Sequence, residues 1–188
     1  RSVTVRTTDQ GGAFFDEVFT IFVTNVNEAP VDINLSNASI AENNAVGGAI
    51  GNFSTTDPDA ANTFTYTLVN GAGSTDNASF TISGNQLQAA VGFNFEAKSS
   101  YSIRVRSTDQ GSLSAEKVFT ISVTNANEAP TDIALTNASV AENSAVGTFV
   151  GNFSTTDPDA ANTFSYTLVS GIGSTDNATF TIVDNQLQ

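Results

Sequence analysis

A gap-free repeat with a period of 100 residues limits what this chain can fold into. Residues 31–88 align with residues 131–188, and 44 of the 58 aligned positions are identical. Residues 1–30 match 101–130 in the same register, as the shared Thr-Asp-Gln-Gly segment illustrates. Repeats of domain length indicate similar modules stacked in tandem, in which the junctions between modules contribute to function.

The repeat boundaries divide the chain into one whole module and two partial ones. We expect the last two strands of one repeat in residues 1–29, a complete repeat in 30–129, and the first part of a third repeat in 130–188. The third repeat would then lack two strands of the kind that residues 1–29 hold. Either the segment ends are arbitrary, or residues 1–29 complete the third repeat of another copy by strand addition.

Alternation of apolar and polar residues is the main structural signal. Phe119, Ile121 and Val123 alternate with threonine and serine, as half-buried strands do. Asp-Gln-Gly and Asp-Pro-Asp segments between such runs favour turns, and no stretch has helical periodicity. Seven strands are expected in the complete repeat, near 31–36, 47–55, 62–70, 78–83, 85–90, 99–107 and 116–125. The sequence therefore predicts an all-β chain of tandem seven-stranded antiparallel Greek-key β-sandwiches of immunoglobulin-like type.

The charge balance excludes several classes of function. The chain has 19 acidic and 6 basic residues, a net charge of −13, and neither histidine nor cysteine. Nucleic acids and anionic membranes both require a basic surface, so neither is expected as a partner, and no apolar run is long enough to span a membrane. A histidine-based catalytic triad is impossible. Asp57 and Asp59 could act as paired carboxylates in a hydrolase, but the same residues are expected in a turn, and we predict no enzyme activity.

Most acidic residues recur at fixed places in the repeat, which suggests a cation site. Some of them lie among apolar residues, such as Glu96 within Phe93-Asn94-Phe95-Glu96, and Asp57-Pro58-Asp59 places two carboxylates close together. Like charges at that distance repel unless a cation lies between them. Without histidine or cysteine, only oxygen ligation is available, and Ca²⁺ tolerates irregular oxygen sites. The alternative is that these residues are ordinary turn and surface residues.

The acidic motifs and their order resemble those of cadherin repeats in bacterial surface proteins. Glu42 matches the glutamate that follows the first strand, and Phe93-Asn94-Phe95-Glu96 resembles the Leu-Asp-Arg-Glu element. Residues 107–111 resemble the Ala-x-Asp-x-Gly element of the family. Residues 125–130 resemble its linker, and residues 157–159 resemble its Asp-x-Asp turn.

The resemblance implies Ca²⁺ bound between consecutive repeats. At the junction between the complete and the third repeat, the implied ligands are Glu42, Asn94, Glu96, Asn125, Asn127, Glu128, Asp157, Asp159 and the carbonyl of Asn162. At the earlier junction they are Asn25, Asn27, Glu28, Asp57, Asp59, Asn62 and Asp109. Asn94 and Asn125 replace aspartates of the family pattern, and the linker is one residue short. We therefore expect one to three weakly bound ions per intact junction, at about 10⁻⁴–10⁻³ M.

These observations predict a non-enzymatic structural or adhesive segment of a large extracellular bacterial protein, stiffened by Ca²⁺ at its junctions. Its partners would be the neighbouring repeats. One alternative is a subunit of a filament, sheath or surface layer, a homo-oligomer assembled by strand exchange. A further alternative is a carbohydrate-binding module for surface glycans, although Tyr66, Tyr101 and Tyr166 follow the strand alternation that favours core packing.

Overall fold

The computed structural model describes residues 1–188 as an all-β protein. Two compact units divide the chain. The first contains residues 1–38, 49–90 and 102–120, and the second contains 39–48, 91–101 and 121–188. Two short 3-10 helices, η1 (Asn77–Ser79) and η2 (Asn177–Thr179), occur at equivalent places in consecutive repeats. No helix is long and apolar enough to cross a lipid bilayer.

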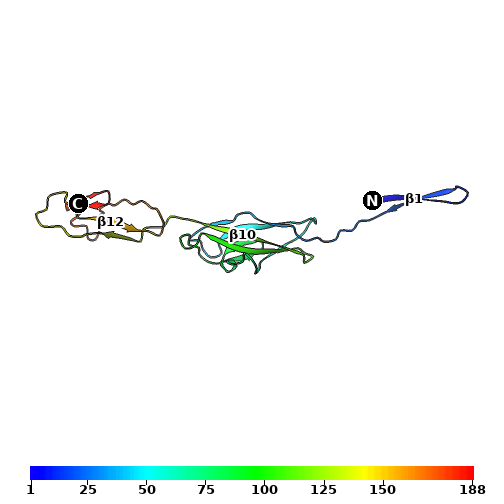
Figure 1. The fold of residues 1–188 in the computed structure, drawn as a ribbon, viewed down its shortest axis with the longest axis horizontal. Coiled ribbons are helices and arrows are strands. Elements are labelled where there is room, and N and C mark those ends of the chain that lie inside the picture. Colours follow the sequence, from blue (N-terminus) through cyan, green and yellow to red (C-terminus); the bar gives the residue numbers. More distant parts are fainter. The chain divides into compact units, whose positions relative to one another are not determined.

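The complete repeat consists of two four-stranded sheets (Figure 1). The first sheet has the order β3-β5-β8-β7, with β3 at Asp32–Leu35, β5 at Ala49–Thr56, β7 at Phe80–Ser83 and β8 at Gln86–Ala89. The second has the order β4-β10-β9-β6, with β4 at Ser39–Ala41, β6 at Thr65–Leu68, β9 at Ser100–Thr108 and β10 at Ser114–Thr124. The seven expected strands are all present at or near their predicted positions.

The structure adds β4, an eighth strand that the sequence pattern did not reveal. It is three residues long and pairs in parallel with the end of β10, where Val123 lies opposite Ile40. A strand this short has too few residues for alternation to be detected. Its place next to the end of β10 fixes the position of Glu42, the residue that follows it.

Alternating side chains of the two sheets form the core, as the sequence pattern predicts. Within the first unit, the Phe53 ring lies 5.3 Å from the Tyr66 ring and 5.6 Å from the Phe119 ring, measured between centroids. The Thr55 hydroxyl joins the sheets, since it hydrogen-bonds to the hydroxyls of Tyr66 at 2.9 Å and Ser107 at 2.6 Å. Ser107 is therefore a buried polar residue whose hydrogen-bonding group has a partner.

The tyrosines pack as the sequence alternation predicts. Tyr66 stacks on Phe53, and Tyr166 stacks on Phe153 with 5.2 Å between ring centroids. In the second unit, Tyr101 meets the Phe93 ring edge-on at 4.7 Å.

The flanking segments contain fewer strands. Residues 1–29 form a hairpin of β1 (Ser2–Thr8) and β2 (Phe14–Thr20), drawn in blue in Figure 1, whose residues are all exposed. The third repeat has one sheet, in the order β11-β12-β14-β13. Its strands are β11 at Asp132–Leu135, β12 at Gly151–Thr156, β13 at Ile182–Val183 and β14 at Gln186–Leu187. Of the five strands expected before Gln188, the one equivalent to β6, near 162–170, is not formed.

Gly51 in β5 lies where the backbone of β5 closely approaches the backbone of Asn37. A Cβ atom at Gly51 would contact the carbonyl oxygen of Asn37 and lie 2.8 Å from its backbone nitrogen, so the backbone would have to move. We expect Gly51→Ala to lower the free energy of unfolding by about 1–3 kcal/mol or more, because overpacking strains the core. Gly92→Ala is the control, since its Cβ would meet the nearest atom at an ordinary 3.5 Å. Urea unfolding that places both variants at the same midpoint would contradict this prediction.

Candidate cation sites at the repeat junctions

Glu42 is the centre of a candidate site in the second unit. Its side chain is only 3% exposed. One carboxylate oxygen accepts the backbone N–H of Phe95 and the other accepts that of Ala126, each at 2.8 Å. Glu42 thus holds the β8–β9 loop and the segment after β10 against the end of β4.

Two further carboxylates meet Glu42 because of these contacts. Glu96 lies in the β8–β9 loop and Glu128 follows β10, and one carboxylate oxygen from each of the three residues lies within 4.8 Å of the others. The Asn43 side chain donates a hydrogen bond to Oε1 of Glu128. The other carboxylate oxygen of Glu128, Oε2, is buried and has no hydrogen-bond partner. Three acidic groups therefore converge with only part of their acceptor capacity used.

The Asp-Pro-Asp turn of the third repeat joins this group. The backbone N–H of Glu128 donates to Oδ2 of Asp159 at 2.8 Å. Asp157 Oδ1 accepts the backbone N–H of Asp159 and the side-chain amide of Asn162, both at 2.9 Å. Asp159 is 8% exposed, and its Oδ1 is buried without a partner. Glu128 and Asp159 thus each have one buried oxygen that no donor satisfies.

The environment shifts the acidities of these groups in opposite directions. Backbone N–H groups of Phe95 and Ala126 hold the pKa of Glu42 below its ordinary value, against the effect of burial. The Glu128 N–H likewise lowers the pKa of Asp159. For Glu96, its own backbone N–H acts to lower the pKa, but burial and the charges of Glu42 and Glu128 together raise it above the ordinary value. The neighbouring carboxylates therefore disfavour the ionised form of Glu96.

A related arrangement occurs at the earlier junction, within the first unit. Asp59 accepts the Asn25 side-chain amide at 2.5 Å and the backbone N–H of Glu28 at 2.7 Å, and both contacts lower its pKa. Asp57 Oδ1 accepts the Asp59 N–H at 2.9 Å, whereas Asp57 Oδ2 is buried without a partner. The Asp-Pro-Asp turn therefore makes the same two backbone hydrogen bonds at both junctions: the first aspartate accepts the N–H of the second, and the second accepts the N–H of the linker glutamate.

Asp109 joins the earlier junction from the end of β9. It is 6% exposed, and its Oδ2 accepts the side-chain amide of Asn27 at 2.9 Å. Asn62 accepts a hydrogen bond from Gln110 at 2.6 Å through Oδ1, and its buried amide nitrogen has no partner. Residues 82 positions apart in sequence thus meet at this junction.

Three of the predicted asparagines make hydrogen bonds within the protein. The Asn94 side-chain oxygen accepts the backbone N–H of Ala97 at 2.6 Å and so stabilises its own turn. Asn127 donates to the carbonyl of Glu128 at 2.9 Å, and Asn125 lies near Glu96, with 3.5 Å between Nδ2 and Oε1. Asn94 thus acts as an acceptor, whereas the amide nitrogens of Asn125 and Asn127 act as donors to an acidic and a carbonyl oxygen.

The sequence analysis missed Asn43 and Gln110. Asn43 has a positive φ of 56°, as does Asn143 at 61°, and asparagine tolerates this left-handed conformation. The sequence signal for Asn43 was an asparagine that directly follows the glutamate in both repeats, Asn43 after Glu42 and Asn143 after Glu142. The two backbone N–H donors to Glu42 could not be found from sequence, since any residue type supplies them.

The residues present fit a hard divalent cation. They offer carboxylate, amide and carbonyl oxygens, which are the ligands that Ca²⁺ prefers. The unsatisfied buried oxygens of Glu128, Asp159 and Asp57 are otherwise costly to bury. A cation would satisfy these oxygens and reduce the repulsion among the carboxylates of Glu42, Glu96 and Glu128.

Sequence comparison identifies the complete repeat. The family model described as the cadherin domain matches residues 36–124. This repeat belongs to the cadherin domain family. No curated protein sequence matches the chain.

Solved structures similar to the chain are cadherin ectodomains. The protocadherin gammaB4 extracellular domain aligns over 100% of the chain and 33% of its own length, with a TM-score of 0.61 and 18% identity. The human desmocollin-1 ectodomain aligns over 86% of the chain and 33% of its own length, with a TM-score of 0.54 and 20% identity. The protocadherin gammaB7 EC3-6 cis-dimer structure aligns over 71% and 32%, with a TM-score of 0.51 and 25% identity. The chain spans about a third of each of these three structures, and the likeness establishes the all-β cadherin fold.

The raised pKa of Glu96 leads to a prediction for the protein in chelator. Removing one charge from the cluster should relieve repulsion, so Glu96→Gln should raise the thermal midpoint at neutral pH without calcium. Glu17→Gln, an exposed position in the hairpin, is the control and should leave the midpoint unchanged. A lower midpoint for Glu96→Gln in chelator would show that the three carboxylates do not repel one another.

The lowered pKa of Glu42 predicts a different pH dependence. Its folded-state pKa lies below the ordinary 4.5, so ionised Glu42 stabilises the fold above that pH and the stabilisation disappears as the pH falls through the folded-state pKa. Glu42→Gln should therefore lower the midpoint at pH 7 in chelator and flatten its decline in acid. The exposed repeat equivalent, Glu142→Gln, should leave the curve unaltered. Parallel acid-unfolding curves for Glu42→Gln and the unmodified protein would refute the assigned role.

Proposed function

We propose that this chain is a calcium-stiffened structural and adhesive segment of an extracellular protein, with Ca²⁺ bound at the junctions between its cadherin-like repeats. The unsatisfied buried oxygens of Glu128 and Asp159, beside the convergent carboxylates of Glu42 and Glu96, are the observation that carries this proposal. Membership of the complete repeat in the cadherin domain family supports it.

The bonding at the junction explains how an ion would stiffen the chain. Glu42 of the complete repeat accepts the N–H of Ala126, and Asp159 of the third repeat accepts the N–H of Glu128. Acids of two consecutive repeats therefore bind the same linker. These acids repel one another without a counter-ion. Ca²⁺ would replace that repulsion with shared coordination and restrict motion of the linker. The chain would then act as a spacer that extends or joins other domains.

The proposed setting is the surface of a bacterial cell or the medium outside it. The sequence motifs resemble bacterial surface repeats, and the comparable solved structures are extracellular cadherin domains. Weak junction sites of about 10⁻⁴–10⁻³ M would fill only where calcium is abundant, which is typical of extracellular modules.

Thermal unfolding in calcium and in chelator tests the proposal. At a free calcium concentration 100-fold above the dissociation constant, binding to the folded state adds about 2.7 kcal/mol to the free energy of unfolding. We therefore expect a clear rise in midpoint with calcium for the unmodified protein. Asp159→Asn should reduce this rise, because it removes a charged oxygen that lacks a donor.

A matched substitution controls for general charge effects. Asp184→Asn, in the turn between β13 and β14, also removes one carboxylate but lies outside the junction. Its response to calcium should equal that of the unmodified protein. An unmodified protein whose midpoint is the same in calcium and in chelator would rule out a functional calcium site.

A further inference from the structure

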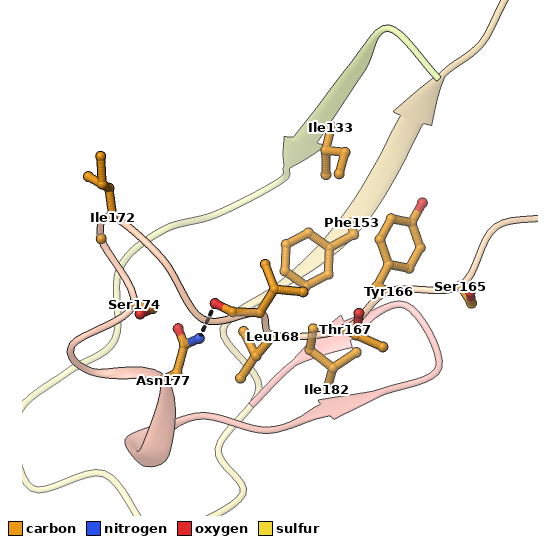
Figure 2. A pocket seen from close by; sticks show the side chains of 12 residues that line it. Ile133, Phe153, Ser165, Tyr166, Thr167, Leu168, Ile172, Ser174, Asn177 and Ile182 are labelled. Atoms are coloured by element: carbon orange, nitrogen blue, oxygen red, sulfur yellow. Dashed lines mark hydrogen bonds between the residues drawn. The ribbon is translucent and has the colours of Figure 1, made fainter. Parts of the chain in front are cut away.

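Asparagine side chains in this chain donate hydrogen bonds to two kinds of oxygen. Within the repeats they bind backbone carbonyls: Asn77 donates to Val69 and Asn177 donates to Val169, each at 2.9 Å, and Figure 2 shows the bond from Asn177. At the repeat junctions the acceptors are carboxylates, and the amides that donate to them belong to Asn25, Asn27, Asn43 and Asn162. The junction amides therefore bind side chains that are themselves predicted calcium ligands.

Asn25 holds an acid of the following repeat to the linker without an ion. Its amide nitrogen donates to Oδ1 of Asp59 at 2.5 Å, across 34 residues of sequence. The other carboxylate oxygen of Asp59, Oδ2, accepts the backbone N–H of Glu28 at 2.7 Å. Both oxygens of Asp59 thus have a donor from the same linker.

A glycine makes room for the next linker amide. Nδ2 of Asn27 donates to Oδ2 of Asp109 at 2.9 Å. A Cβ atom at Gly111 would lie 2.5 Å from that amide nitrogen, so a side chain at position 111 would displace it. Two acids of the complete repeat, Asp59 and Asp109, are therefore bound by two amides of the linker that precedes it.

Asn125 has the equivalent position at the junction between the complete and the third repeat. Its Nδ2 lies 3.5 Å from Oε1 of Glu96 in the complete repeat. In the third repeat, the Glu128 N–H lowers the pKa of Asp159 most, burial opposes this effect, and the Asn125 amide lowers the pKa further. One neutral NH₂ group therefore interacts favourably with a carboxylate from each of two repeats.

An aspartate at this position would have the opposite effect in the absence of an ion. A primary amide has two N–H donors on one nitrogen, so it can bridge two carboxylates as a cation does. A third carboxylate in the same place would repel both acids unless a cation separated them. The amide is part of the chain and needs no calcium, but it brings no positive charge.

The junction therefore has a second position that the amide does not neutralise. The carboxylates of Glu42, Glu96 and Glu128 still converge there. Oε2 of Glu128 and Oδ1 of Asp159 are buried and have no donor, so these oxygens remain open to a cation.

We propose that Asn25 and Asn125 each take the place of one junction cation, so that the linker is held to the following repeat without calcium and calcium fills only the remaining carboxylate position. The calcium part of this inference rests on the proposed function, whereas the amide bridge itself requires no ion. The residue at this linker position then sets how many ions a junction binds and how much order it keeps in chelator.

Hydrogen exchange in chelator tests the amide bridge without calcium. The backbone N–H groups of Glu28 and Glu128 donate to the aspartates that the two amides bind, so NMR should find both N–H groups protected in the unmodified protein. Asn25→Ala should speed exchange of the Glu28 N–H several-fold and leave that of Glu128 unchanged. Asn125→Ala should do the reverse, so each junction is the control for the other.

A further N–H group reports any general loss of stability. The Val69 N–H donates to the Arg104 carbonyl at 2.9 Å within the complete repeat. Its exchange should be the same in the two alanine variants and in the unmodified protein.

Asn125→Asp should turn the amide position into a further cation position. In chelator the added carboxylate should lower the thermal midpoint, because it repels Glu96 and Asp159. Calorimetric titration with calcium chloride should show an additional bound ion and an affinity about tenfold higher, since affinity depends on the number of charged ligands. Asn70→Asp is the matched control: it makes the same change at an exposed loop position outside the junctions and should alter neither property.

The outcomes separate this inference from the calcium proposal. If calcium raises the midpoint of the unmodified protein but both alanine variants leave exchange unchanged, the amide bridge is wrong and the calcium site stands. If the alanine variants exchange faster while calcium leaves the unmodified midpoint unchanged, the bridge stands and the calcium position is wrong. If Asn125→Asp binds calcium as the unmodified protein does, the amide does not take the place of a cation.

Discussion

The Glu42 carboxylate, held between the backbone N–H groups of Phe95 and Ala126, is the contact on which the junction depends. It fastens the β8–β9 loop and the linker to the end of β4, and it is almost completely buried. Both oxygens accept a backbone hydrogen bond, so the charge is satisfied where it lies. The same two anchors bring Glu96 and Glu128 against it, which turns a stabilising contact into a cluster of acids.

The junction therefore combines satisfied and unsatisfied carboxylates. Glu42 has a donor on each oxygen, whereas Glu128 and Asp159 each keep a buried oxygen with none. The asparagines that replace family aspartates moderate this imbalance. Asn25 donates directly to Asp59, which a carboxylate at that position could not do. Amides thus lower the negative charge and supply hydrogen bonds, and they also lower the attraction for a cation.

The sandwich itself depends on a second constraint, the need for two sheets to cover each other. In the complete repeat, Phe53 and Thr55 of one sheet meet Phe119 and Ser107 of the other. In the third repeat the corresponding Phe153 borders an open groove. Short strands such as β4 form only where a longer neighbouring strand offers an edge to pair with.

The sequence by itself determined the repeat, the strand pattern and the residue types available for ligation. Alternation predicted β3 and β5 to β10, because one face of each strand packs in the core and the other faces water. Recurrence of acids at fixed positions and the resemblance to cadherin repeats predicted a larger ligand set that includes Glu42, Glu96 and Glu128, and only the structure places these three carboxylates together. Only the tertiary structure decided which oxygens have donors, that Asn94 stabilises its own turn, and that Asn43 binds Glu128. Hydrogen bonds from backbone N–H groups leave no trace in residue type, and burial of a carboxylate depends on segments up to 84 residues away, such as Ala126 from Glu42.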